Sequence, residues 1–238
     1  MSYDNSTHIT DEAWDNYCQA LRNEKSNNVR GYEAMYAGKT VGPARDYDSH
    51  FNGGMLTGSA IKQAIEDGDI TISDFDESRL NTNSYNLRLS DVFKKYAAPN
   101  REDGFIDISK GCKTKEIINI HGTDVSRPKK LYLRPGDFVL GSTMETVASD
   151  KYIPIITGRS SIGRYSISVH QEAGFGDIGF SGKWTLQLST LLPVIITPGM
   201  EICQVYFITP IGVVDQLYNG KYQNSVGPQE SKFYTEHR

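Results

Sequence analysis

Cysteine is scarce in this 238-residue sequence, which contains only Cys18, Cys112 and Cys203. These residues lie far apart and form no Cys-x-x-Cys pair, so the sequence predicts neither a disulfide framework nor a structural zinc site. Long apolar runs are also lacking. A signal peptide needs about 7 to 15 apolar residues and a membrane span about 20, whereas the apolar stretches near the N-terminus are only a few residues long. We therefore expect a soluble protein of the reducing cytoplasm, without a membrane partner.

Excess positive charge is lacking as well, since 25 Lys and Arg are set against 29 Asp and Glu, for a net charge of -4. A nucleic acid is bound by a positive surface that releases counterions, so no nucleic-acid partner is expected. The 22 Gly and 9 Pro are ordinary numbers for a globular chain of this length, which excludes collagen-like and low-complexity proteins.

The length suits one domain with an appendage, and we expect three parts. Residues 1–54 form an N-terminal extension with one helix near 11–24, residues 55–210 form the domain, and residues 211–238 form a tail. The domain is expected to begin with a short helix, because Thr57 suits an N-cap and Gly68 suits a helix terminator.

Short runs rich in β-branched and aromatic residues follow this helix, separated by turn sequences such as Pro-Gly and Gly-Lys. Many short strands with tight turns predict a mainly β domain, either a sandwich or a barrel. The predicted strands are Ile70–Ile72, Tyr85–Leu89, Leu131–Leu133, Phe138–Leu140, Ile153–Ile156, Ile167–Val169, Trp184–Leu188, Val194–Ile196 and Ile202–Phe207.

The segment Gly174–Gly179 matches Gly-x-Gly-x-x-Gly, which binds a dinucleotide only where it opens a helix. The residues after it alternate as a strand does, so a hairpin turn with glycine at positive φ is favoured. His170 and Glu172 match the His-x-Glu half of the zinc deaminase signature, but the Pro-Cys-x-x-Cys half is absent. His170 is therefore a candidate strand residue or polar pocket group, and no protein-bound metal is predicted.

Two cations, two hydroxyls and free backbone N–H groups gather in the segment Gly158–Arg164, directly after an apolar strand. Guanidinium groups bind phosphate oxygens bidentately, so this segment is a candidate triphosphate site, with a solvated turn as the alternative. Asp177 is a candidate ligand-facing carboxylate or a turn cap. The tail carries Tyr218 and Lys221, which makes it a candidate lid over a nucleotide, with a disordered end as the alternative.

Seven motifs occur in one order over about residues 55–232. Together they closely resemble the dCTP deaminase branch of the trimeric dUTPase superfamily, and they leave residues 1–54 uncovered. The motifs begin at Met55, Asn83, Arg134, Gly158, Ala173, Pro198 and Lys221, with the sequences MLT, NSYNLRL, RPGDFVL, GRSSIGR, AGFGDIGFSG, PGMEICQ and KYQ.

The resemblance implies a distorted β-barrel that assembles as a homotrimer, with active sites at subunit interfaces and Mg2+ bound through the nucleotide triphosphate. It implies that Arg159, Ser160 and Ser161 hold phosphates. Ser160 and Arg164 would line the pyrimidine site, and Asp177 and Phe180 would meet the deoxyribose. Tyr218 and Lys221 would close over the phosphates. The remaining candidate nucleotide-binding residues are His170, Ala173 and Gln223.

The sequence departs from the family pattern at three positions. Gln187 stands where the family's deaminases carry a Glu as general base, and a neutral amide cannot take a proton from water. Glu172 stands where the family usually has Thr. If a hairpin turn centres on residues 178 and 179, Glu172 pairs with Thr185 and lies diagonal to Gln187, about 7 Å away. Glu172 is then the predicted replacement base. Asn86 replaces a common Asp and alters a structural hydrogen bond.

The first expectation is therefore a zinc-independent dCTP deaminase, in which activated water attacks C4 of the cytosine and dUTP and ammonia are formed. A modified cytosine nucleotide is a variant of this substrate. The alternative is a dUTP diphosphatase that forms dUMP and pyrophosphate, with Asp177 directing water at the α-phosphate. A second alternative is a nucleotide-binding sensor without turnover.

Overall fold

The computed structural model describes residues 53–97, 104–116 and 130–236. The predicted helix near residues 11–24 lies outside the described residues. The division of the chain at residues 54 and 210 stays a prediction.

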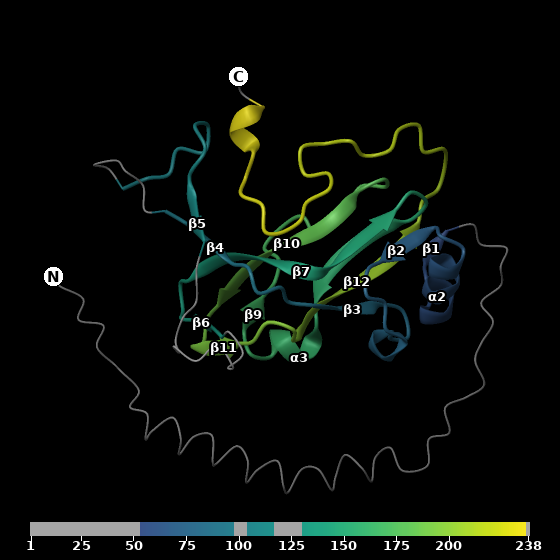
Figure 1. Ribbon diagram of the computed structural model, residues 1–238, viewed down its shortest axis with the longest axis horizontal. Coiled ribbons are helices and arrows are strands. Elements are labelled where there is room, and N and C mark those ends of the chain that lie inside the picture. The colour runs from purple at the N-terminus through teal and green to yellow at the C-terminus, as the bar shows by residue number, and fades with distance from the viewer. Residues whose placement is uncertain (1–52, 98–103, 117–129, 237–238) are drawn as a thin grey trace, which may run out of the picture. The chain divides into compact units, whose positions relative to one another are not determined.

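The described residues form a mainly β fold with few helices, as predicted (Figure 1). The helical elements are α2 (Gly58–Glu66), α3 (Ser160–Gly163), η1 (Glu77–Arg79) and η2 (Phe233–Thr235). The strands are β1 (Gly54–Met55), β2 (Ile70–Ile72), β3 (Tyr85–Arg88), β4 (Lys94–Tyr96), β5 (Thr114–Glu116), β6 (Leu131–Leu133), β7 (Phe138–Ser149), β8 (Ile153–Gly158), β9 (Ile167–Ser168), β10 (Ser181–Thr190), β11 (Val194–Ile196) and β12 (Glu201–Thr209).

Helix α2 begins and ends where the sequence predicts. The hydroxyl of Thr57 accepts a hydrogen bond from the backbone nitrogen of Ala60 at 3.3 Å. Ile61 and Ala64 are buried, and Gly68 has a φ of +80° just beyond the helix. An N-cap and a left-handed glycine therefore bound the helix.

The strands form three antiparallel sheets around one core. One sheet has the order β5-β4-β7-β10-β9, with β2 also paired to β7; a second has the order β1-β12-β3, with β8 also paired to β12; β11 and β6 form the third. The described strands do not close into one continuous ring, so the predicted barrel is a distorted one.

Strand β10 positions the residues discussed below. Its side chains alternate, so that Trp184, Leu186 and Leu188 are buried in the core. Because successive side chains point to opposite faces of a sheet, Thr185 and Gln187 lie together on the other face.

The predicted pairing of Glu172 with Thr185 is wrong. Strand β9 pairs with β10 in the predicted register, with Ser168 opposite Ser189, but the strand ends at Ser168. The chain then turns, and Ala173 has a φ of +55°. Residues 174–176 instead join β8, where the backbone nitrogen of Ile156 donates to the carbonyl of Gly174 at 2.6 Å. The predicted hairpin is therefore a longer loop, because the glycine segment finds its hydrogen bonds on β8.

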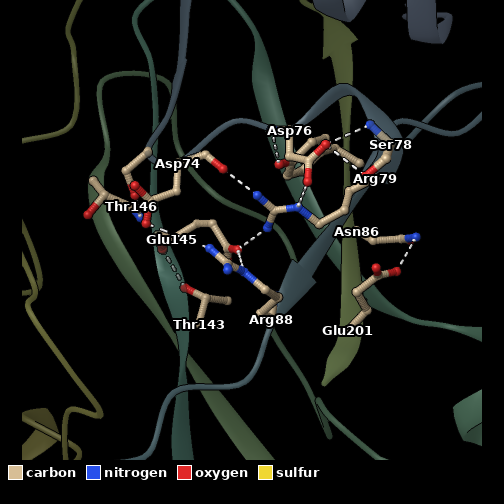
Figure 2. A network of polar contacts seen from close by, with 12 residues as sticks. Asp74, Asp76, Ser78, Arg79, Asn86, Arg88, Thr143, Glu145, Thr146 and Glu201 are labelled. Carbon is tan, nitrogen blue, oxygen red and sulfur yellow. Dashed lines mark hydrogen bonds and ion pairs between the residues drawn. The ribbon is translucent and has the colours of Figure 1, made fainter. Parts of the chain in front are cut away.

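A buried carboxylate ties η1, β3 and β7 together (Figure 2). Glu145 on β7 is 0% exposed and lies between two arginines. Its Oε1 accepts from Arg79 Nη1 and, at 2.7 Å, from Arg88 Nε, while Oε2 accepts from the Arg88 backbone nitrogen at 2.9 Å. Because a buried charge without a partner is costly, loss of either arginine would leave the Glu145 carboxylate poorly compensated.

Candidate functional site

A cavity of about 570 Å3 lies between the outer face of β10, strand β4 and the C-terminal tail. It brings together seven of the predicted site residues. These are His170, Ala173, Asp177, Phe180, Gln187, Tyr218 and Lys221.

The tail closes this cavity by pairing with β10, beside which it runs in Figure 1. The backbone nitrogen of Asn224 donates to the carbonyl of Ser181 at 2.8 Å, and that of Lys183 donates to the carbonyl of Ser225 at 2.8 Å. Further along, the backbone nitrogen of Gln229 donates to Thr185 Oγ1 at 3.0 Å. The tail therefore folds over the body of its own chain.

Gln223 holds the tail in place and does not line the cavity. Its Nε2 donates to the carbonyl of Gly179 at 2.7 Å, and its Oε1 accepts from the backbone nitrogen of Ser181 at 2.9 Å. Both ends of the amide are thus used within the chain, so its role is to anchor the tail.

Aromatic rings form the wall beside Asp177. The ring of Phe180 lies edge-on to Trp184 at 5.3 Å and to Tyr218 at 5.9 Å between centroids. Gly179 allows the tail to approach this closely, because a Cβ at its position would lie 2.7 Å from Leu217 Cβ. Its φ of +93° also favours glycine, as predicted. Asp177 is exposed at the rim, which suits a carboxylate that meets a ligand.

His170 offers an unused acceptor. Its Nδ1 lies 2.7 Å from the carbonyl oxygen of Glu172, so Nδ1 carries the proton and Nε2 is a bare acceptor. Nε2 is buried without a hydrogen-bond partner in the described residues. Burial lowers the pKa of His170 below its ordinary value of 6.5, which keeps the ring neutral at neutral pH.

Gln187 is held by the backbone that follows β9. Its Oε1 accepts from the backbone nitrogens of Gln171 at 3.0 Å and Glu172 at 3.5 Å. Only the amide oxygen can accept from these N–H groups, so Oε1 is occupied. The end of the amide that is left for other partners is Nε2, which is a donor. Glu172 is exposed and lines an adjoining groove of about 370 Å3 beside β8, which shares His170 and Ala173 with the cavity. The structure therefore does not bring the predicted replacement base into the Gln187 cavity.

The predicted phosphate and pyrimidine residues of the segment Gly158–Arg164 lie elsewhere in the structure. Ser160, Ser161 and Arg164 are exposed on and beside α3, on the opposite side of the body from the tail (Figure 1). Arg159 precedes α3, and its Nη1 donates to the backbone carbonyl of Glu201 at 2.7 Å. None of these four residues lines the 570 Å3 cavity. Within one chain, these candidate residues therefore lie apart from the cavity.

Sequence reasoning missed an ion pair between the tail and β4. Lys94 Nζ lies 2.9 Å from Glu230 Oε2, and Glu230 also lines the cavity. The hydrogen bond from Lys94 lowers the pKa of the Glu230 carboxyl. The two residues lie 136 positions apart, and no local pattern in the sequence could have paired them.

Within the described residues, no three His, Cys, Asp or Glu side chains gather where they could hold a metal ion. The same part of the chain contains no helix long and apolar enough to cross a membrane.

Comparison with known proteins agrees with the predicted resemblance. The dCTP deaminase-like family model matches residues 55–209. The chain is 41% identical over 180 residues to a protein of Clostridium acetobutylicum named dCTP deaminase, dUMP-forming, a match that covers 76% of this chain and 96% of that protein. It is 40% identical over 181 residues to a protein of the same name from Hathewaya histolytica, covering 76% and 97%. A solved 2'-deoxycytidine 5'-triphosphate deaminase from Agrobacterium tumefaciens is similar at 19% identity and a TM-score of 0.47, over 67% of this chain and 47% of that one. The chain belongs to the dCTP deaminase-like family.

Proposed function

We propose that the protein hydrolyses pyrimidine deoxynucleoside triphosphates to the monophosphate and pyrophosphate. The observation that carries this proposal is the 570 Å3 cavity, in which Asp177 lies with the rings of Phe180 and Tyr218 and the cation of Lys221. The rings suit the sugar. The Lys221 ammonium pairs with the Glu236 carboxylate in this structure, and in this proposal it exchanges that partner for phosphate. Relatives named as dUMP-forming dCTP deaminases support the proposal, because forming dUMP from dCTP requires cleavage of the phosphate chain.

Asp177 directs the attacking water in this proposal. A water held by the carboxylate attacks the α-phosphorus, the bond from that phosphorus to the bridging oxygen breaks, and pyrophosphate leaves. The water proton passes to the carboxylate or to solvent. In this proposal Mg2+ held by the triphosphate oxygens would offset their charge.

Deamination of dCTP is the second candidate, and the names of the relatives favour it. It requires a base that takes a proton from water near C4. Gln187 cannot serve. Glu172 is the candidate base, and its backbone nitrogen contacts Gln187 Oε1 at 3.5 Å. Its side chain lines the neighbouring groove, so we rank phosphate hydrolysis first.

A homotrimer forms part of the proposal. Arg159, Ser160 and Ser161 lie outside the cavity of their own chain, so a second subunit would have to supply them. This division between subunits supports sites at the interfaces.

The test is to incubate the pure protein with Mg2+ and dUTP, dCTP or a 5-substituted dCTP and to separate the products. Monophosphate with pyrophosphate supports the first proposal. Deaminated triphosphate with ammonia supports the second candidate. Nucleotide that binds and remains unchanged would indicate a sensor and overturn both.

A further inference from the structure

We infer that Glu201, held in turn by Asn86, is a positioning residue that aims Arg159 at the triphosphate. This inference rests on the proposed function, in which Arg159 binds phosphate oxygens. It arises from a hydrogen bond between Asn86 and Glu201 and an ion pair between Glu201 and Arg159, which join the three side chains across β3 and β12. Figure 2 shows the Asn86 and Glu201 end of this chain.

Glu201 binds the guanidinium of Arg159 through two oxygens. Arg159 Nη1 lies 2.7 Å from the Glu201 backbone carbonyl and 3.1 Å from its Oε2. Both contacts use the same nitrogen. The guanidinium is therefore held at one corner, and its orientation is set by a residue that itself belongs to a strand.

The opposite edge of Arg159 is left available. Arginine has five N–H donors, and Nε and Nη2 make no hydrogen bond to any described residue. These two nitrogens form the planar fork that binds phosphate oxygens bidentately. The Arg159 side chain is 29% exposed, so this fork has access to a ligand.

Asn86 fixes the Glu201 carboxylate from the other side. Its Nδ2 donates to Glu201 Oε2 at 2.8 Å, and its Oδ1 accepts from Asn81 Nδ2 at 2.9 Å. The two contacts are consistent with one orientation of the Asn86 amide, with Nδ2 as the donor to Glu201 and Oδ1 as the acceptor from Asn81. An Asp at position 86 would instead place a second carboxylate against Glu201, where like charges repel. The asparagine thus holds the Glu201 carboxylate directed at Arg159 without placing a like charge beside it.

The test is a double-mutant cycle on Arg159 and Glu201, read as the affinity for Mg2+ and non-hydrolysable α,β-imido-dUTP by calorimetry. Glu201→Gln should weaken binding about three- to ten-fold, because one partly exposed charge-assisted bond is lost while the backbone contact remains. In the Arg159→Ala background the same change should have less than about a two-fold effect, since Glu201 then has nothing to position. Glu77→Gln is the matched control, because Glu77 is an exposed carboxylate that pairs with Lys62 instead.

Equal weakening in both backgrounds, or unchanged or tighter binding by Glu201→Gln, would overturn the inference. The proposed function fails separately, if Arg159→Ala binds the analogue as well as the unaltered protein does.

Exchanging the two side chains at positions 86 and 201 tests whether Glu201 has a merely structural role. Asn86→Asp with Glu201→Gln restores a hydrogen bond in the reverse direction at the same net charge. We expect the swap to recover the Tm lost in Asn86→Asp while affinity stays at the Glu201→Gln level; recovery of both would contradict positioning.

Discussion

The amide oxygen of Gln187 lies 3.0 Å from the backbone nitrogen of Gln171, and this contact fixes what the side chain can do in the cavity. With its oxygen engaged, the amide can only donate there. Gln187→Glu would replace the amide NH2 group with an oxygen. One carboxylate oxygen would keep the backbone contact, and the other would be an acceptor and a base in the cavity. We expect this variant to gain deamination of dCTP by about 100-fold, measured as ammonia release.

Gln187→Met is the matched control, since it has a similar volume and no polar group at its end. It should release no more ammonia than the unaltered protein. If Gln187→Glu also releases no more, the lack of a carboxylate at this position is not what limits deamination.

The buried network around Glu145 should dominate stability (Figure 2). Arg79→Met leaves the buried carboxylate without one of its two arginines, and we expect the free energy of unfolding in urea to fall by about 3 kcal/mol or more. Lys62→Met removes a cation from an exposed ion pair with Glu77 and should leave the unfolding midpoint unchanged. Similar midpoints for both variants would show that the network is dispensable.

The ion pair between Lys94 and Glu230 should make tail closure depend on pH. The pKa of Glu230 is lowered below its ordinary value of 4.5, chiefly by the hydrogen bond from Lys94. The ion pair therefore stabilises the bound tail fully above pH 4.5. This stabilisation is lost as the pH falls through the lowered pKa of Glu230. Hydrogen exchange at Lys183 and Asn224, whose amides bond across the tail, should rise at acid pH relative to the intrinsic exchange rate at each pH. Lys94→Met should raise it at neutral pH. If neither acid pH nor Lys94→Met changes the exchange at these amides, the backbone pairing alone holds the tail.

Shared active sites predict complementation between inactive variants. If each site takes Arg159 from one subunit and Asp177 from its neighbour, an equal mixture of Arg159→Ala and Asp177→Asn chains, unfolded and refolded together, should recover about a quarter of the sites. Each variant refolded alone should remain impaired. Light scattering should give about three times the mass of 26.6 kDa. A mixture no more active than its components would place both residues in sites made by one chain.

The sequence predicted the parts of the fold that follow simple alternation. Strands β2, β6 and β11 have the predicted bounds, because short apolar runs between turn residues define them. The prediction for β7 stopped at Leu140, although the strand continues to Ser149. Its continuation buries Ser142, Thr143 and Glu145, which resemble a loop in sequence because their burial depends on partners far along the chain.

The sequence did not predict the geometry of the candidate site, and the roles of its residues stay predictions. Asp177, Phe180 and Tyr218 do meet at one cavity. Glu172 lines the adjoining groove and not the Gln187 cavity, because the glycine segment that follows it pairs with β8 and not with β10. That choice between two strands depends on tertiary packing, which the local pattern of glycines does not specify.

The role of Asp177 is the most direct test of the proposed hydrolysis. Asp177→Asn keeps the size of the side chain and one acceptor oxygen, but it removes the charge that orients water and turns the other oxygen into an NH2 donor. We expect it to slow cleavage of dUTP to dUMP by about 100-fold or more while changing the affinity for α,β-imido-dUTP by less than about three-fold. Glu172→Gln, measured in parallel, should cleave dUTP at the unaltered rate. Undiminished cleavage by Asp177→Asn, or loss of cleavage in Glu172→Gln, would contradict the proposal.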